Sequence, residues 1–293
     1  MPSTLLPQPV VVGVTDGQTS RVALDWAIDE ATTRRLPLHI LHAGPRPPNP
    51  RLGSHPRTSE SRAPVIARAA RRARGLTPWL EVTTEVSTST PSLALVDSSR
   101  RAACVIVGAH GRRPVVSGML GSTSVEVAAR AACPVVVVRQ LPEVESWRPG
   151  VVVGADGSEA SAEALRYAFA QAVDRELPLK VVHVWPPRVT RAFLAPALRA
   201  SLATIAASDE ALVAEEVARW AEKYPEVKVH RHVLRANPVK ALVDHSRGAE
   251  LLVLGCRVRA EARGIVLGSV SQGVLQHAHC PVAVVPALVR TAE

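Results

Sequence analysis

The chain has 293 residues, enough for two domains of ordinary size that each bury a core of their own. Hydrophobic residues make up 47 % of it, which excludes an intrinsically disordered chain. The formal net charge of +9 is spread over scattered arginines and aromatic residues are only 3 %, so nothing specific supports nucleic-acid binding.

Short valine-rich segments alternate with alanine-rich segments along the first half of the chain. The valine-rich segments are apolar on both faces, as buried parallel strands are, and lie at 10–14, 38–43, 82–86, 104–108 and 134–138. Helical spacing occurs between them, at 20–34, 63–74, 91–102 and 122–132. This alternation predicts the α/β class, with a doubly wound parallel sheet and right-handed crossovers.

Two segments of the first half stand out by their composition. Residues 44–62 are rich in Pro, Arg and Ser, which predicts a mobile loop. The arginines that follow lie on a predicted helix and are interpreted as a solvated face; they are Arg68, Arg71, Arg72 and Arg74. The second half has a predicted long alanine-rich helix near 198–223 instead, and 141–149 is the predicted linker between the halves.

The second half of the chain repeats the first. VVVGVTDG at 10–17 matches VVVGADG at 151–157, a match that aligns Asp16 with Asp156. His42 recurs as His183, 141 positions later, and Gly121-Ser122 recurs 147 positions later as Gly268-Ser269. So many matches indicate a duplication, with one Rossmann-like domain at 1–140 and a second at 149–293.

The histidines and cysteines of the repeat are typical of structural positions. His42 and His183 are predicted to be packed and hydrogen-bonded at a strand end. The cysteines form no C-x-x-C pair and no metal-binding spacing, which predicts reduced thiols in a cytoplasmic protein without metal; they are Cys104, Cys133, Cys256 and Cys280. Cys104 and Cys133 are predicted to be small buried hydrophobic residues. No secretory signal and no bilayer-length apolar run is visible, so no membrane partner is expected.

A glycine-containing segment follows the predicted strand at 104–108. Gly108 and Gly111 come first, and Gly121 then opens a predicted helix with Ser122, Thr123 and Ser124. Glycine lets the backbone approach phosphate and take positive φ, while a helix N-terminus supplies free N–H donors and a favourable dipole. Ligands of such sheets bind at the carboxyl ends of the strands, so this pattern predicts a phosphate site.

These motifs resemble the universal stress protein family. Its ATP-binding members carry G-x2-G-x9-G-[ST] before the last helix and then a CPV-type strand, and Cys133-Pro134-Val135 follows the glycines here. The resemblance places the family's adenosine-contacting aspartate on Asp16 and its adenine-edge backbone position on Ala43. It implies a tandem-domain stress-response protein that binds ATP, with or without Mg²⁺, and that forms a homodimer and acts on an unknown regulatory partner.

The predicted nucleotide contacts of the first copy surround this pattern. They are Thr15, Asp16, Gly17, Ala43, Gly108, His110, Gly111, Arg112, Gly121, Ser122, Thr123 and Ser124. Two alternatives stay open: Asp16 could instead cap the following helix, and His110 could have a structural role rather than act as a general base.

The second copy departs from the motif at one glycine. Its counterpart residues are Asp156, Gly157, Val184, Gly255, Gly268, Ser269, Val270 and Ser271. Val258 replaces the second glycine, and a β-branched residue resists positive φ and would crowd phosphates. Gly264 could restore some flexibility, and Asp156 and Gly157 are expected to keep the adenosine end intact. The second site is predicted to be weak or absent.

Three classes of function remain open. The favoured one is a regulatory ATP-binding protein whose nucleotide state alters its conformation or its partners. The second is a slow nucleotide hydrolase or nucleotidyl-transfer enzyme, although no lysine precedes Lys180, so the first copy has no Walker lysine. The third is a scaffold that needs no nucleotide. No catalytic residue is predicted.

Overall fold

The computed structural model describes residues 7–44, 62–109, 120–139, 150–185, 196–256, 259–261 and 264–287. Contacts between residues divide the chain into two compact units, 1–140 and 141–293. The predicted mobile loop, apart from its ends Gly44 and Arg62, and the predicted linker at 141–149 lie outside the described residues.

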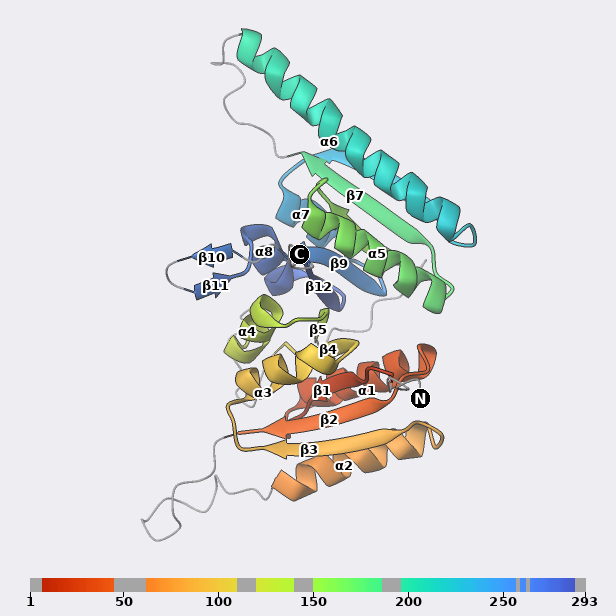
Figure 1. Cartoon of the computed structure of the whole chain (residues 1–293), viewed down its shortest axis with the longest axis vertical. Coiled ribbons are helices and arrows are strands. Elements are labelled where there is room, and N and C mark those ends of the chain that lie inside the picture. Colours follow the sequence, from red (N-terminus) through yellow and green to blue (C-terminus); the bar gives the residue numbers. More distant parts are fainter. Residues whose placement is uncertain are drawn as a thin grey trace, which may run out of the picture. The chain divides into compact units, whose positions relative to one another are not determined.

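The first unit alternates strands and helices as the sequence predicts (Figure 1). Its five strands are all parallel and lie in the order β3-β2-β1-β4-β5. The elements are β1 (Val10–Gly13), α1 (Gln18–Thr33), β2 (Leu38–Ala43), α2 (Arg62–Leu76), β3 (Val82–Ser87), α3 (Pro91–Ser98), the 3₁₀ turn η2 (Ser99–Arg101), β4 (Cys104–Gly108), α4 (Ser122–Arg130) and β5 (Val135–Val138).

The second unit repeats this topology, with its parallel strands in the order β8-β7-β6-β9-β12. A two-stranded antiparallel hairpin, β10 and β11, is added between β9 and the last helix. The elements are β6 (Val151–Ala155), α5 (Glu159–Asp174), β7 (Leu179–Trp185), α6 (Pro196–Lys223), β8 (Val229–Arg235), α7 (Pro238–His245), β9 (Leu251–Cys256), β10 (Arg259–Glu261), β11 (Gly264–Val266), α8 (Ser269–His277) and β12 (Val282–Pro286). The α/β class with two Rossmann-like copies is therefore confirmed.

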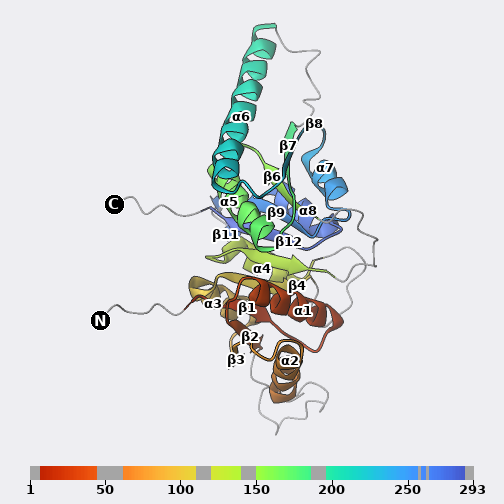
Figure 2. The ribbon, with the colours of Figure 1, turned by 90° about the vertical axis from the view of Figure 1, so that its right-hand side faces the viewer.

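Helices cover both faces of each parallel sheet, as Figure 2 shows from the side. In the first unit α1 and α2 pack against each other on one face, while α3 and α4 pack together on the other. The central strands are consequently buried on both sides: Val10, Val12, Ile40 and Ile106 have no exposed surface. This double cover explains why their sequences are continuously apolar.

The prediction that every strand is buried on both faces is wrong for β3. Residues 83–86 are exposed, and only the two ends of the strand are partly covered. The reason is its position, because β3 lies at the edge of its sheet and its polar residues face water. The corresponding strand β8 of the second unit is largely exposed for the same reason.

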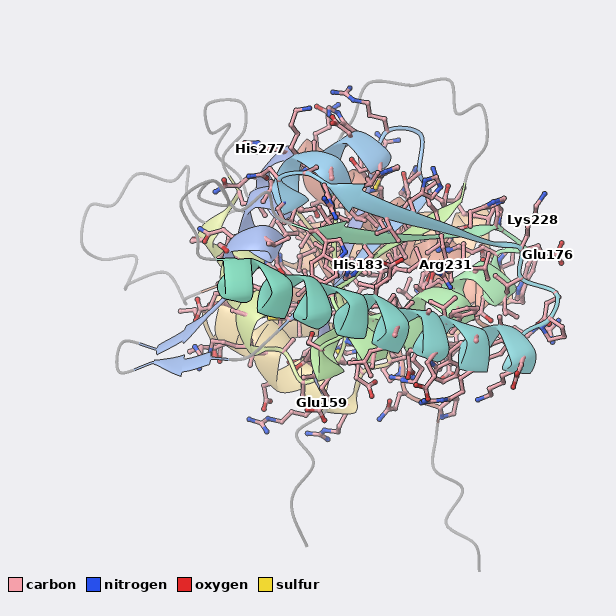
Figure 3. All side chains as sticks on the ribbon, turned by 90° about the horizontal axis from the view of Figure 1, so that it is seen from above. Glu159, Glu176, His183, Lys228, Arg231 and His277 are labelled. Carbon is pink, nitrogen blue, oxygen red and sulfur yellow. The ribbon has the colours of Figure 1, made fainter. Side chains whose placement is uncertain are left out.

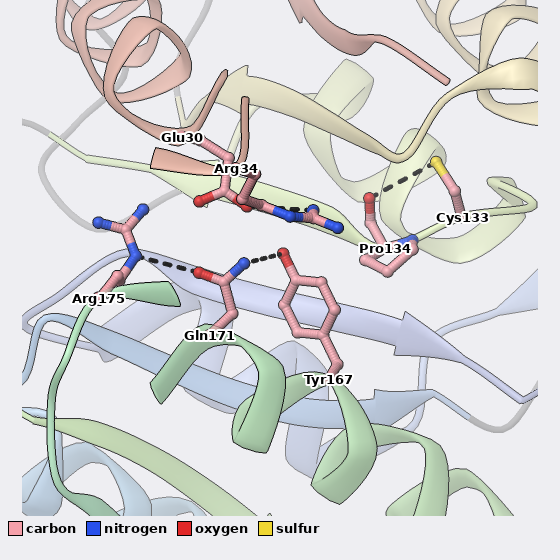
Figure 4. A network of polar contacts seen from close by, with 7 residues as sticks. All are labelled: Glu30, Arg34, Cys133, Pro134, Tyr167, Gln171 and Arg175. Atoms are coloured by element: carbon pink, nitrogen blue, oxygen red, sulfur yellow. Dashed lines mark hydrogen bonds and ion pairs between the residues drawn. The ribbon is translucent and has the colours of Figure 1, made fainter. Parts of the chain in front are cut away.

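The first helix of each copy carries the same buried polar pair (Figure 4). In α1, Arg34 Nη1 lies 3.3 Å from Oε1 of the fully buried Glu30. In α5, the Nε of Arg175 donates to Gln171 Oε1 at 3.0 Å, and the amide of Gln171 donates to the hydroxyl of Tyr167 at 3.3 Å. Within each pair the two residues are one helical turn apart, so each buried polar group has a hydrogen-bond partner on its own helix.

The strand-end glycines Gly108 and Gly255 allow the first helix of each copy to pack closely. A Cβ on Gly108 would lie 2.9 Å from the carbonyl oxygen of Thr19, and a Cβ on Gly255 would lie 2.3 Å from that of Ala160. Both obstacles are backbone atoms in the first helical turn, which cannot rotate aside. A packing constraint therefore requires glycine at these two positions.

This constraint predicts that Gly255→Ala destabilises the chain. The added methyl group must push backbone apart, and such overpacking costs about 1–3 kcal/mol of unfolding free energy. Gly75→Ala is the matched control, because a Cβ there meets nothing within 4 Å and alanine favours a helix by roughly 0.5–1 kcal/mol. Urea denaturation would measure both. An unchanged midpoint for Gly255→Ala would show that the close approach is not a constraint.

Candidate functional site

The predicted contacts of the first copy gather at the carboxyl edge of its sheet. β1 lies between β2 and β4, and Val12 pairs with Ile106, so the chain leaves β1 and β4 side by side. Ala43 ends β2 at the same edge, paired with Ser87 of β3. The strand order reverses here, which makes this edge the usual ligand position of a doubly wound sheet.

The start of α4 is held against the end of β4. The backbone N–H of Gly121 donates to the carbonyl of Ala109 at 2.8 Å, and the hydroxyl of Ser124 donates to the carbonyl of Gly108 at 2.8 Å. Ser124 is buried in making this bond, whereas Ser122 is exposed at the first helical position. Ser124 therefore fixes the geometry, while Ser122 is free to meet a ligand.

No side chain caps the N-terminus of α4 among the described residues. Gly121 is the N-cap residue, and it has no side chain that could accept from the first-turn N–H groups. Those N–H groups, together with the helix dipole, form a site suited to an anion such as a phosphate. The loop that would complete the site contains His110, Gly111 and Arg112, which lie outside the described residues.

Positive φ is not the reason for the described glycines of the motif. Gly121 has φ −66° and Gly268 has φ −59°, both in extended or related conformations that other residues adopt. At Gly268 a Cβ would meet nothing within 4 Å, so glycine there only leaves the space before the helix open. Gly108, as shown above, is explained by packing against α1.

The alignment of Asp16 with Asp156 is wrong, because the structure pairs Thr15 with Asp156. The N–H of Thr15 donates to Ser20 Oγ at 2.8 Å, and the N–H of Asp156 donates to Ser161 Oγ at 3.2 Å. Ser20 and Ser161 are 141 positions apart, and so are the residues whose N–H groups they accept, Thr15 and Asp156. Asp16 consequently occupies the position of Gly157 and is exposed.

The turn after the first strand differs between the copies. In the first copy Gly17 is the N-cap of α1, with φ −74°, so Asp16 precedes the cap and does not fill the capping position. In the second copy Gly157 has φ 76°, and Ser158 caps α5 by accepting from the N–H of Ser161. The turns therefore differ in geometry, and the prediction that Asp156 and Gly157 keep the adenosine end of the second copy remains a prediction.

Asp156 takes part in the cap of its own helix. Its Oδ1 accepts from the backbone N–H of Ser158 at 3.1 Å and also from the Ser158 hydroxyl. Ser158 thus holds one carboxylate oxygen of Asp156 within the turn that starts α5. The offset of 141 positions between Ser20 and Ser161 is the sequence signal that identifies Thr15, and not Asp16, as the counterpart of Asp156.

The two predicted strand-end histidines are confirmed as packed and hydrogen-bonded. His42 Nδ1–H donates to the Val14 carbonyl at 2.7 Å, and His183 Nδ1–H donates to the Ala155 carbonyl at 2.7 Å. Both rings are buried, and Figure 3 shows His183 in the interior of the second unit. Each histidine thus fixes the carbonyl at the exit of the first strand, directly before the turn that distinguishes the copies.

The loop of the second copy folds as a hairpin. Gly264 pairs with Glu261 in the β10–β11 ladder, so it contributes to a strand rather than giving the loop the flexibility expected of it. Val258 lies outside the described residues. The helix start is nevertheless similar, since Gly268 is the N-cap of α8 and the Ser271 hydroxyl donates to the Gly255 carbonyl at 3.4 Å.

The cysteines lie in the core. All four are buried and none is in a disulfide; they are Cys104, Cys133, Cys256 and Cys280. Burial raises the pKa of Cys133 and of Cys280 to about 12. Within the described residues, no group of three or more His, Cys, Asp or Glu side chains could hold a metal ion. None of the described helices combines the length and apolar character needed to cross a membrane.

Comparison with known proteins gives consistent results across the chain. The sequence profile of the universal stress protein family matches residues 7–139 and 150–286. A universal stress protein of Mycobacterium tuberculosis is 34 % identical over 287 residues, which cover 94 % of this chain and 96 % of its own length.

Two solved structures share the fold over nearly the whole chain. A protein of unknown function from Pseudomonas aeruginosa PAO1 has a TM-score of 0.67 at 16 % identity and covers 97 % of this chain and 94 % of its own. A universal stress protein from Archaeoglobus fulgidus DSM 4304 has a TM-score of 0.63 at 19 % identity, with 97 % and 98 % covered.

The raised thiol pKa values predict slow reaction with thiol reagents. At pH 8 a thiol of pKa about 12 is ionised in roughly one molecule in ten thousand, and only the thiolate reacts. Ellman's reagent should therefore label the native chain slowly and all four cysteines rapidly in guanidinium. Thr88→Cys, at an exposed position, is the positive control. Rapid labelling of the native chain would contradict the burial.

The same shift predicts a pH dependence of stability. Unfolded cysteines ionise near 9.0, whereas native Cys133 and Cys280 ionise only near 12. As the pH rises above 9, the unfolded chain loses protons that the native chain keeps, so the free energy of unfolding should fall. Replacing both residues by alanine should flatten this slope in urea titrations between pH 8 and 10. An unaltered slope would argue that other groups cause it.

Proposed function

Because the chain belongs to the universal stress protein family through two tandem copies of its domain, we propose that it is a regulatory protein whose first copy binds ATP. Its nucleotide state would alter its conformation or its affinity for a protein partner. The observation that carries the proposal is the uncapped N-terminus of α4, which Ser124 and Gly121 hold against the end of β4 at the reversal of strand order.

The phosphate end of the site is formed by the start of α4. Exposed Ser122 and the first-turn N–H groups supply donors, Gly111 of the preceding loop belongs to the G-x2-G-x9-G-S pattern, and the neighbouring Arg112 adds positive charge. A triphosphate carries several negative charges, which the helix dipole and an arginine both favour. Mg²⁺, where it accompanies the nucleotide, would neutralise part of the remaining charge.

The adenosine end of the site differs from the family pattern. Thr15 stands where the second copy has Asp156, so a hydroxyl takes the place of the carboxylate that the family pattern puts at the adenosine end. Asp16 is the next residue and is exposed, and Ala43 offers its backbone at the end of β2. We propose that Thr15 or Asp16 makes the sugar contact and that Ala43 meets the adenine edge.

The second copy is proposed to bind nucleotide weakly or not at all. It keeps the helix start at Gly268, but its loop contains the β10–β11 hairpin and Val258 in place of a glycine. Asp156 is also engaged by Ser158. One tight nucleotide per chain follows, bound for regulation and turned over slowly if at all. Association of two chains as a homodimer remains a further prediction from the family.

Ser122→Ala should weaken ATP binding roughly tenfold or more, because it removes a hydrogen bond to a charged phosphate. Ser269→Ala is the matched control, since Ser269 is exposed at the same helical position of the second copy. Isothermal titration with ATP and GTP would measure both affinities and the stoichiometry. Two equivalent tight sites, or equal losses from both variants, would exclude the proposed asymmetry.

Substitutions after the first strand test the adenosine end. Asp16→Ala and Thr15→Val should each be titrated with ATP, because only the residue that contacts the sugar should reduce affinity strongly. Asp156→Ala should leave the tight site unchanged, since Asp156 belongs to the other copy. Retention of full affinity in both Asp16→Ala and Thr15→Val would show that neither side chain contacts the ligand, and steady ATP turnover above background would favour an enzyme.

A further inference from the structure

Four basic side chains gather on one face of the sheet in the second unit. Lys180 of β7 pairs in register with His230 of β8, and His232 lies two residues further along the same face of β8. α7 covers this face, while α6 lies on the opposite one (Figure 2). His245 is the last residue of α7, and the centre of its ring lies 5.3 Å from that of His232. Together they form a basic cluster: Lys180, His230, His232 and His245.

The basic cluster lies away from the start of α8, the position that corresponds to the phosphate end of the site in the first copy. Lys180 and His230 are the second residues of their strands, close to the amino edge of the sheet. α7 begins after β8 and ends before β9, and these strands run in the same direction, so His245 also lies toward the amino edge. Nucleotides bind to such sheets at the opposite, carboxyl edge. The basic cluster is therefore a separate place in the fold.

The positive charge of the basic cluster has no carboxylate partner within the part of the chain that the structure describes. There, Lys180, His230 and His232 form neither an ion pair nor a hydrogen bond with Asp or Glu. Asp244 neighbours the cluster on α7, but it is exposed and its carboxylate lies 3.3 Å from Nζ of Lys240. An anion that entered the cluster would thus meet cationic groups that are not already neutralised.

The corresponding face of the first copy carries a carboxylate. His39 stands at the position of Lys180, and its Nε2 lies 3.3 Å from Oε2 of Glu85 in the neighbouring strand. Its Nδ1 lies 2.9 Å from the hydroxyl oxygen of Thr83. The register of the strands places His232 of the second copy where the first has Glu85, so a basic group stands in the position of an acidic one. The cationic character of this face therefore distinguishes the second copy from the first.

Burial and charge repulsion keep two of the histidine rings neutral at pH 7. Burial lowers the pKa of His232 below its usual value, and the charges of Lys180 and His230 lower it further. Burial and Lys180 also lower the pKa of His245, although Asp244 opposes that shift. The dipole at the end of α7 favours a protonated His245 as well. A bound anion would stabilise the charged form of both rings, so its binding would take up protons.

We propose that the basic cluster binds a doubly charged tetrahedral oxyanion, namely inorganic phosphate or a phosphate monoester. The ammonium group of Lys180 supplies a permanent positive charge, and the rings of His232 and His245 supply N–H donors. A phosphate group has enough oxygens to accept from all three side chains, whereas a carboxylate offers two. This binding does not depend on nucleotide binding by the first copy.

A metal ion fits the basic cluster less well. Two imidazole rings at this separation could approach one ion, but the ammonium group of Lys180 would repel it. Within the described ranges, no three His, Cys, Asp or Glu side chains are placed to hold a metal ion. The charge of the lysine therefore favours an anion.

Titration of the histidine rings by NMR tests the proposal on the unmodified full chain. Sulfate is the first probe, because it stays doubly charged at pH 6 and pH 8 and leaves only the protein to titrate. The resonances of His232 and His245 should move, their pKa values should rise, and binding should be about threefold or more tighter at pH 6 than at pH 8. His39 is the internal control, because Glu85 shares its face of the first copy, and its resonances should stay in place.

The source of the phosphate group is tested by comparing two further probes. Inorganic phosphate and glycerol phosphate should both displace sulfate from the histidine rings. Tighter binding of glycerol phosphate would support a monoester as the ligand, and tighter binding of inorganic phosphate would support the free anion. Acetate that binds as well as sulfate would overturn the preference for a doubly charged anion.

One substitution in the cluster and one outside it test which charge matters. Lys180→Gln should weaken sulfate binding roughly tenfold, because it removes a hydrogen bond between charged groups. Arg235→Gln is the control, since it removes one exposed charge from the other face of β8 and should change the affinity by about twofold or less. Thermal unfolding would establish that both variants fold. Unmoved resonances of His232 and His245, weaker binding at pH 6, equal losses from the two variants, or Zn²⁺ bound by the two rings in preference to sulfate would each overturn the proposal.

Discussion

The structure of each copy depends on one close backbone contact, between the end of its fourth strand in chain order and the first turn of its first helix. Gly108 and Gly255 have no side chain, and this lets a helical carbonyl come within a distance that no Cβ would tolerate. The contact places the helix start and the strand end at one edge of the sheet. The loop that leaves this glycine and the turn that precedes the helix therefore share the position where a ligand can bind.

Hydrogen bonds from side chains then fix the two chain segments that leave this edge. Ser124 holds the start of α4 on the Gly108 carbonyl, and Ser20 receives the N–H of Thr15. His42 fixes the carbonyl of Val14 from the neighbouring strand. These bonds hold the described part of the edge in place, and such preorganisation lowers the conformational entropy that binding would have to overcome.

The fold is predictable from one sequence because burial imposes a pattern of apolar residues on strands and helices. The details of the site are not predictable in this way. Valine runs and helical spacing predict the elements, but VTTEV alternates too little to indicate that β3 is an edge strand. The sequence suggests a false match of Asp16 with Asp156 because an Asp-Gly pair occurs in both turns, one position apart in register. The hydrogen bonds from the N–H groups of Thr15 and Asp156 show which residues correspond, and residue propensities do not predict such bonds.

The β10–β11 hairpin bears on how the two copies have diverged in sequence. Under the proposed asymmetry, the second copy no longer holds a phosphate but still has to fold, so its loop can change while the residues that folding needs are kept. The second copy retains Gly255 and His183, which packing and hydrogen bonding require, but it has Val258 where the first has Gly111. A fused duplicate of this kind is a record of ancestry, and the positions that still agree include Gly255 and His183, which folding itself requires.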